Sequence, residues 1–312
     1  MRPVIVAAIW MCLSAEAAFA DVDPVVEPAK MSVTAKGLVA DLYVPAHANS
    51  APLPGIIILG GSEGGMGAAA ARDGKIIAQR GYAVLQLAYF DSPGLPKDLG
   101  LIPLEYFKSA IDWLRTQPGV NPDRIGIVGG SVGSEVALTV AAHYPEIRAV
   151  VATMPSSVVW PGIVHTEGAP PSTFTLARKP LPFLPYGYPF TSIFNLYAKG
   201  LLALDEHRDA IIPVERINGP VMLICGKSDS LWPSCPMAEQ VDARLKSQHF
   251  THPVQLLEYQ NAGHAVFGKP RSSDDPQIAD LTQEGGSIEG NQAARRDSWM
   301  RAMAFIDAAL KR

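Results

Sequence analysis

The chain has 312 residues, of which 48% are hydrophobic and 18% charged, and its formal net charge is −4. This composition supports a large buried core, excludes an intrinsically disordered chain, and gives no sign of nucleic-acid binding. The length fits one domain, because large α/β sheets with insertions reach this size. The three cysteines and the scattered histidines lack metal-ligand spacing, so we expect no metal and no cofactor.

Residues 1–20 have the three parts of a secretory signal sequence. Arg2 supplies the positive charge, residues 3–13 are apolar but too short to span a bilayer, and Ala18-Phe19-Ala20 is a small-x-small cleavage site. An amphipathic amino-terminal helix is the alternative. We expect cleavage after Ala20, export to the periplasm or the medium, and a mature domain over residues 21–312 with no stable membrane anchor.

Cleavage would leave two cysteines, Cys225 and Cys235, in an oxidising compartment. They form either a disulfide or two buried thiols. The sequence leaves both possibilities open, because it does not show whether the two Cα atoms come within bridging distance.

Strands and helices alternate along most of the chain. Residues 31–44 predict an antiparallel hairpin at the edge of a sheet. Apolar runs predict buried strands at residues 55–59, 82–87, 125–128, 149–153, 221–225 and 254–259. Helical periodicity predicts helices at residues 68–80, 101–116, 132–143, 237–246 and 292–310. Regular alternation of this kind indicates an α/β fold with a mostly parallel sheet, right-handed crossovers and helices on both faces.

The alternation stops between residues 155 and 213, where prolines and aromatic residues are concentrated. Because the pattern resumes directly afterwards, we interpret this segment as an insertion into the domain, covering the site as a lid. We predict that its aromatic side chains line an acyl pocket, and the alternative is a cap that never moves. These side chains are Trp160, Phe174, Phe183, Tyr186, Tyr188 and Phe190.

Gly129-Gly130-Ser131-Val132-Gly133 lies between a predicted buried strand and a predicted helix. This is the pattern of a nucleophile elbow, in which a strained turn exposes a serine hydroxyl at the carboxyl end of a strand. The positions two before and two after the serine must be very small, and Gly129 and Gly133 meet that requirement. We therefore predict that Ser131 is a catalytic nucleophile.

A serine nucleophile requires a base, and the base requires a carboxylate to orient it. Both should follow strand ends, in the chain order serine, acid, histidine. Asp229 follows the predicted strand 221–225, and His264 follows the predicted strand 254–259. We predict that Ser131, Asp229 and His264 form a catalytic triad.

The glycine-rich stretch 60–65 also contains a G-x-S-x-G match, centred on Ser62. We prefer Ser131, because the loop after an early strand is where this architecture supplies an oxyanion donor. The predicted oxyanion hole is the backbone N–H of Val132 with that of Ser62 or Glu63. The alternative for the glycines is an ordinary tight turn.

Residues 55–270 resemble the carboxyl-terminal catalytic domain shared by acyl-CoA thioesterases and bile acid-CoA:amino acid N-acyltransferases, an α/β-hydrolase family similar to dienelactone hydrolases. The resemblance is most specific in residues 81–90, 95–97 and 104–107, and in the elbow. Asp229 and His264 stand where the family has its acid and its base. Its transferase branch typically has cysteine at the elbow, so Ser131 favours hydrolysis.

The resemblance implies a thioesterase that acts on a small-molecule acyl thioester through an acyl-enzyme. Export leaves a carboxylesterase acting on ordinary esters as the main alternative. A catalytically silent hydrolase fold used for binding is a further alternative, against which the three predicted catalytic residues argue.

Overall fold

The computed structural model describes residues 26–46, 51–64, 66–165 and 168–311. The predicted signal sequence and its cleavage site lie outside the described residues. Within the described ranges, no helix combines the length and the apolar character that crossing a membrane requires.

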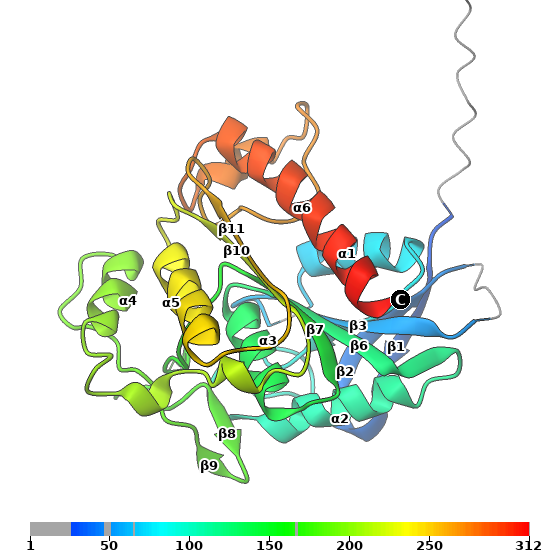
Figure 1. Cartoon of the computed structure of the whole chain (residues 1–312), viewed down its shortest axis with the longest axis horizontal. Helices are drawn as coiled ribbons and strands as arrows, with labels where there is room; N and C mark the ends of the chain where they lie inside the picture. Colours follow the sequence, from blue (N-terminus) through cyan, green and yellow to red (C-terminus); the bar gives the residue numbers. More distant parts are fainter. Residues whose placement is uncertain (1–25, 47–50, 65, 166–167, 312) are drawn as a thin grey trace, which may run out of the picture.

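Eight strands form one sheet in the order β1-β2-β4-β3-β6-β7-β10-β11 (Figure 1). The two pairs β1–β2 and β2–β4 are antiparallel, and the remaining neighbours are parallel. The predicted edge hairpin is therefore confirmed. The strands are β1 (Ala29–Val33), β2 (Val39–Val44), β3 (Leu53–Leu59), β4 (Ala83–Ala88), β6 (Val120–Gly130), β7 (Ile147–Thr153), β10 (Val221–Gly226) and β11 (Val254–Tyr259).

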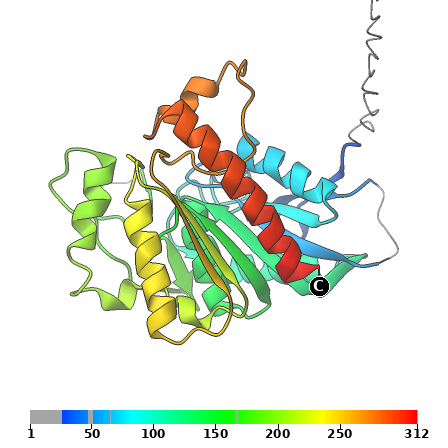
Figure 2. The ribbon, with the colours of Figure 1, turned by 45° about the horizontal axis from the view of Figure 1, so that its top comes forward.

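Helices cover both faces of this sheet, as predicted. Because side chains alternate along a strand, Ile57 of β3 packs on one face and Ile56 on the other. The face of Ile56 is covered by α1 (Ala68–Gln79) and α6 (Ile288–Leu310), and Figure 2 shows these two helices on the same side of the sheet. The opposite face is covered by α2 (Leu104–Arg115), α3 (Val132–His143) and α5 (Ser234–Ser247).

Residues 155–213 contain regular structure that the sequence did not predict. A small sheet joins β5 (Ile102–Pro103), β8 (Phe174–Leu176) and β9 (Lys179–Pro180), and helix α4 spans Ile193–Leu201. Helix α2 begins later than predicted because Ile102–Pro103 joins this sheet. Single 3-10 turns are η1 (Ala35–Gly37), η2 (Arg208–Ala210), η3 (Val214–Arg216) and η4 (Ile278–Thr282).

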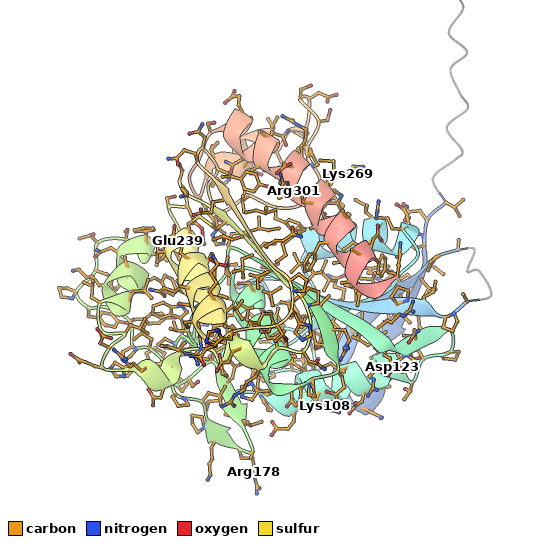
Figure 3. All side chains as sticks on the ribbon, viewed as in Figure 1. Lys108, Asp123, Arg178, Glu239, Lys269 and Arg301 are labelled. Carbon is orange, nitrogen blue, oxygen red and sulfur yellow. A yellow bond between two sulfur atoms is a disulfide. The ribbon has the colours of Figure 1, made fainter. Side chains whose placement is uncertain are left out.

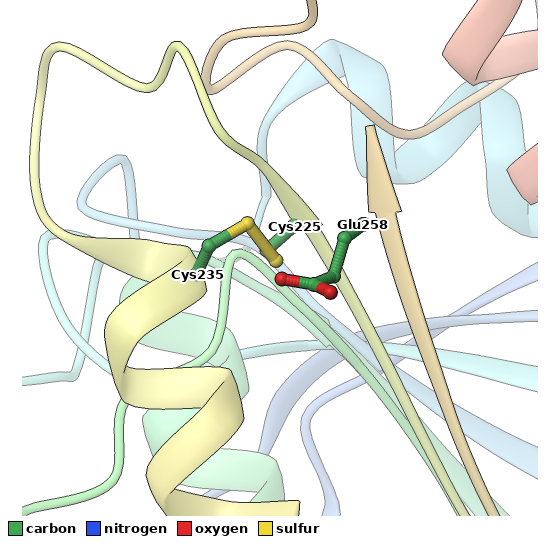
Figure 4. Close-up of side chains that lie close together, drawn as sticks. All are labelled: Cys225, Cys235 and Glu258. Atoms are coloured by element: carbon green, nitrogen blue, oxygen red, sulfur yellow. A yellow bond between two sulfur atoms is a disulfide. The ribbon is translucent and has the colours of Figure 1, made fainter. Parts of the chain in front are cut away.

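Cys225 and Cys235 form a disulfide with a Cα–Cα distance of 5.1 Å. It joins the carboxyl end of β10 to the first turn of α5 (Figure 4). The question that the sequence left open is thus answered in favour of the disulfide. The bond closes the loop that contains Asp229.

Candidate active site

Ser131 lies in a strained turn between the central strand β6 and helix α3. Its backbone angles are φ 56° and ψ −128°, in a region that residues other than glycine rarely adopt. The turn is fixed by a 2.9 Å hydrogen bond from the Ser131 N–H to the carbonyl of Thr153 on β7. Ser62, the rival serine, is absent from the residues with positive φ. The backbone strain expected of an elbow is therefore found at Ser131.

The two elbow glycines allow the strand, the helix and the preceding loop to pass at backbone distance. A Cβ atom at Gly129 would lie 2.0 Å from the carbonyl oxygen of Gly133. A Cβ atom at Gly133 would lie 2.2 Å from the carbonyl oxygen of Gly60. No side chain fits at either position, which agrees with the size requirement inferred from the sequence.

Asp229 and His264 are brought together at the ends of the neighbouring strands β10 and β11. His264 Nδ1 lies 2.8 Å from Asp229 Oδ2, and both residues are buried. A carboxylate only accepts hydrogen bonds, so Nδ1 carries the proton and Nε2 is left as the basic nitrogen of the neutral ring. Nε2 is buried and has no hydrogen-bond partner within the described part of the chain.

The Asp229 carboxylate is held by four donors. Oδ1 accepts from the N–H groups of Leu231 and Trp232, at 2.9 and 3.2 Å. Oδ2 accepts from Ser234 Oγ at 2.7 Å and from His264. A carboxylate held in this way cannot rotate freely, and its direction fixes the plane of the imidazole. Sequence reasoning did not identify Ser234, and no local motif marks it.

A third loop, residues 281–286, joins the loop of the acid to that of the histidine. The carbonyl of Glu284 accepts from the N–H of His264 at 3.0 Å and from that of Ser230 at 3.2 Å. Asn291 of α6 secures the same region, since its Oδ1 accepts from the Gly263 N–H at 2.8 Å. Its Nδ2 donates to the carbonyl of Leu281 at 2.8 Å. Sequence reasoning also missed Asn291, which is fully buried.

Ser131 and His264 line the same cavity, of about 340 Å³. The other walls come from the loop after β3, the start of α1, the end of β7 and the loop after β11. Ser131 Oγ and His264 Nε2 make no hydrogen bond with each other in the described structure. Catalytic hydrogen bonds are often long before substrate binds, so this spacing is compatible with a serine and base that act together.

The glycine-rich loop after β3 passes directly beside the elbow. A Cβ atom at Gly61 would lie 3.2 Å from Ser131 Cβ, so only bare backbone fits there. The buried hydroxyl of Tyr89 donates to the carbonyls of Gly60 and Gly61, each at 2.8 Å, and fixes the loop. Within the described part of the chain, the N–H groups of Ser62, Glu63 and Val132 have no acceptor.

The aromatic residues of the insertion do not line this cavity. Trp160 stacks on Tyr186 with ring centroids 6.1 Å apart, in a separate core that also contains Trp232. Phe183 packs against the main core instead. The remaining insertion aromatics are Phe174, buried in the main core, and the exposed pair Tyr188 and Phe190. Contact of these side chains with a substrate therefore stays a prediction.

Glu135, one turn after Ser131, ties helix α3 to the segment 155–213. Its Oε1 accepts from the N–H of Trp160 at 3.0 Å, and the side chain is fully buried. Burial raises the pKa of its carboxyl group from 4.5 to about 8. The residue thus contacts protein backbone and lies outside the lining of the cavity.

One group of three potential metal ligands occurs among the described residues: Cys225, Cys235 and Glu258 (Figure 4). Both sulfur atoms belong to the disulfide, so neither is available as a thiolate. Glu258 also forms an ion pair with Lys227 at 3.0 Å. This arrangement does not fit a metal centre.

Solved structures with a similar fold are hydrolases. A putative dienelactone hydrolase from Klebsiella pneumoniae matches with a TM-score of 0.54 and 18% identity, over 89% of this chain and 97% of its own. MGS-M1, an alpha/beta hydrolase enzyme from a deep-sea metagenome library, matches with a TM-score of 0.57 and 15% identity, over 91% and 98%. The predicted α/β-hydrolase fold is therefore confirmed.

Curated relatives are acyl-CoA thioesterases. Peroxisomal succinyl-coenzyme A thioesterase of Mus musculus is 27% identical over 86% of this chain and 62% of its own length. Acyl-coenzyme A thioesterase 2, mitochondrial, of Homo sapiens is 28% identical over 85% of this chain and 54% of its own length. The chain therefore spans less than two thirds of these relatives.

A family model described as BAAT / Acyl-CoA thioester hydrolase C terminal matches residues 102–312. The match covers the elbow, both strand-end loops and helix α6. It confirms the resemblance drawn from the sequence motifs, and the chain belongs to the BAAT / acyl-CoA thioester hydrolase C-terminal family.

Proposed function

We propose that the protein is a serine hydrolase that cleaves a small-molecule acyl thioester through an acyl-enzyme. The observation that carries this proposal is the hydrogen bond between His264 and Asp229 at the wall of a cavity that Ser131 also lines. The strained backbone of Ser131 supports its role as the nucleophile. Membership of the thioester hydrolase family supports the bond class.

In the proposed mechanism, Ser131 Oγ attacks the acyl carbonyl while His264 Nε2 takes the serine proton. The carbon–oxygen ester bond forms, the carbonyl becomes an oxyanion, and Asp229 stabilises the imidazolium. Collapse of the tetrahedral intermediate expels the thiolate, which receives the proton from His264. Water then attacks the acyl-enzyme carbonyl while His264 Nε2 takes the water proton. The second tetrahedral intermediate expels Ser131 Oγ, which receives that proton, and the acid is released.

We assign the oxyanion hole to the backbone N–H of Val132 and that of Ser62 or Glu63. Each such donor contributes about 3 kcal/mol to stabilisation of the transition state. The free N–H groups beside Ser131 support this assignment. The hydroxyl of Tyr89 would keep the loop in place throughout, because it bonds two successive carbonyls.

Of the two alternatives, only the first keeps specific support. A carboxylesterase acting on ordinary esters would use the same residues, and export would favour it over an enzyme of coenzyme A thioesters. A silent binding protein with a hydrolase fold would not need the four donors that orient Asp229. Secretion is itself a proposal, and the disulfide supports it because disulfides persist in oxidising compartments.

The test compares the purified wild type with Ser131→Ala and Ser62→Ala on p-nitrophenyl esters and acyl thioesters of the same acyl group. We expect Ser131→Ala to abolish turnover and labelling by a fluorophosphonate probe, and Ser62→Ala to retain both at reduced rate. Circular dichroism checks that both variants fold. The reverse pattern would reject the assignment, and an unlabelled wild type would favour the silent protein.

Export is tested separately by expressing the full chain in a Gram-negative host and measuring the intact mass of the protein recovered from the periplasm. We expect a species that begins at Asp21 and has lost two hydrogens to the disulfide. Recovery of the uncleaved chain from the cytoplasm alone would reject the signal sequence.

A further inference from the structure

The cavity beside Ser131 has acidic walls. Three of its lining residues are carboxylates, namely Glu63, Asp73 and Glu284, and its described lining contains no lysine and no arginine. A cavity lined by one sign of charge selects ligands of the opposite sign. The net charge of the cavity depends on which of these carboxylates have a positively charged partner.

Asp73 is balanced by two arginines that lie outside the cavity lining. Arg72 Nε lies 3.1 Å from Asp73 Oδ1, and the buried Arg295 also offsets its charge. Arg295 donates at the same time to the carbonyls of Ala265, at 3.2 Å, and of Lys269, at 2.9 Å. Both arginines are thus engaged with protein groups, and Asp73 adds little net charge to the cavity.

Glu63, which is exposed, and the half-buried Glu284 form no ion pair among the described residues. Glu63 is close to the reaction centre, as the geometry of Gly61 shows. A Cβ atom built on Gly61 would lie 3.1 Å from Glu63 Oε2 and 3.2 Å from Ser131 Cβ. The carboxylate and the serine Cβ are therefore no farther apart than the sum of these two distances.

Glu284 also lines the cavity. Its backbone carbonyl accepts from the N–H of His264, so its position is tied to the predicted base. A group bound in this cavity would meet its lining residues Glu63 and Glu284 and also His264 Nε2, a buried atom with no partner within the described part of the chain. A buried nitrogen that lacks a protein partner indicates, independently of the carboxylates, that a ligand binds here.

Among the described residues, the lysines and arginines lie outside the lining of this cavity. Figure 3 shows Arg178 at the tip of the β8–β9 turn, projecting away from the body. Lys227, on the loop of Asp229, is paired with Glu258. The described lining of the cavity thus contains no lysine or arginine that could balance its carboxylates. A positive charge on the substrate would be attracted to the carboxylates of Glu63 and Glu284.

We propose that this site selects acyl groups by charge, and that its substrates bear a positive charge on the acyl group rather than a negative one. The inference rests on the proposed function, since it places the scissile carbonyl at Ser131. It implies that acyl groups ending in a carboxylate, such as succinyl or adipoyl, are poor substrates. It also implies that a quaternary ammonium or amine on the acyl chain improves the reaction.

The test uses three p-nitrophenyl esters of similar shape. They carry 4-(trimethylammonio)butyryl, which is cationic, its neutral carbon isostere 5,5-dimethylhexanoyl, and adipoyl, which is anionic. We expect kcat/KM to fall in that order, with each step about three- to tenfold. About 0.5 M NaCl should compress the series, because salt screens charges on partly exposed groups.

Glu63→Gln should reduce the ratio of kcat/KM for the cationic ester to that for the anionic ester by at least about threefold, because it removes one carboxylate near Ser131. Glu206→Gln is the matched control, since Glu206 is exposed on the insertion and lies outside the cavity lining. It should leave the ratio unchanged. Hydrolysis of the adipoyl ester as fast as the cationic one by the wild type would overturn the inference. Absence of turnover of the neutral ester would instead count against the proposed function.

Discussion

The side-chain oxygen of Asn291 accepts a 2.8 Å hydrogen bond from the backbone N–H of Gly263, the residue before His264. We therefore propose that Asn291 is a positioning residue for the predicted base. We expect Asn291→Ala to lower kcat by about 10- to 100-fold, because small displacements of a catalytic group are costly. Asn291→Asp keeps the acceptor but places a buried carboxylate oxygen against the carbonyls of Leu281 and Gly285, so it should not restore activity.

Gln292 is the matched control for Asn291. It is the next residue on α6, it is also buried, and its amide bonds both backbone groups of Arg271, far along the loop from His264. Gln292→Ala should cost stability without moving the pH profile of kcat/KM. An equal loss of kcat in both variants, at equal stability, would show that Asn291 has only a structural role.

Glu135 makes stability depend on pH in an unusual direction. Because its folded-state pKa of about 8 lies above the ordinary 4.5, the folded protein holds this proton more tightly than the unfolded chain does. As pH rises from 4.5 to about 8, the free energy of unfolding should therefore decrease. Glu135 contributes at most about 1.4 kcal/mol per pH unit to this decrease.

Glu135→Gln keeps an acceptor for the Trp160 N–H but does not titrate. The variant should therefore gain stability over the wild type progressively as pH rises from 4.5 to about 8. Urea denaturation at a series of pH values measures the difference. A difference that is constant across this window would contradict a proton bound at Glu135.

Reduction of the Cys225–Cys235 disulfide should destabilise the protein by about 3 kcal/mol, as expected for a closed loop of about ten residues. The loop contains Asp229, so loss of activity should precede global unfolding. Activity and far-ultraviolet circular dichroism, followed together during reduction, separate the two events. Full activity of the Cys225→Ala/Cys235→Ala variant would show that the bond serves stability alone.

Gly133→Ala should prevent the elbow from forming, because the new methyl group would meet the carbonyl of Gly60 at 2.2 Å. We expect at least about 3 kcal/mol of destabilisation or no soluble protein. Gly74→Ala in α1 is the control: its Cβ would make only ordinary contacts, the nearest at 3.5 Å. That variant should be as stable as the wild type or more so.

Local sequence patterns predicted the parts of the fold that depend on local physics. The predicted strand 125–128 and the predicted helix 132–143 flank Ser131. In the structure, β6 ends and α3 begins at the residues on either side of Ser131. Glycine spacing identified the elbow because the close backbone contact between Gly129 and Gly133 arises within a stretch of five residues. Strand ends likewise identified Asp229 and His264, which the structure brings into contact.

Contacts between distant segments could not be predicted in this way. Ser234 and Asn291 are ordinary polar residues on helices, and only the folded chain brings their side chains to Asp229 and Gly263. Composition set residues 155–213 apart from the regular alternation but did not show the direction of their aromatic side chains. Its helix α4 did carry a signal, since Ser192 caps the N–H of Asn195 at 3.1 Å.

The carbonyl of Glu284 serves two amides, one beside Asp229 and one at His264. The acid and the base are therefore mechanically joined through a peptide unit that belongs to neither of their loops. A single proteolytic nick between residues 270 and 277 would leave the sheet intact and yet release the support on which both depend. We therefore expect such a nick to abolish turnover while far-ultraviolet circular dichroism stays unchanged.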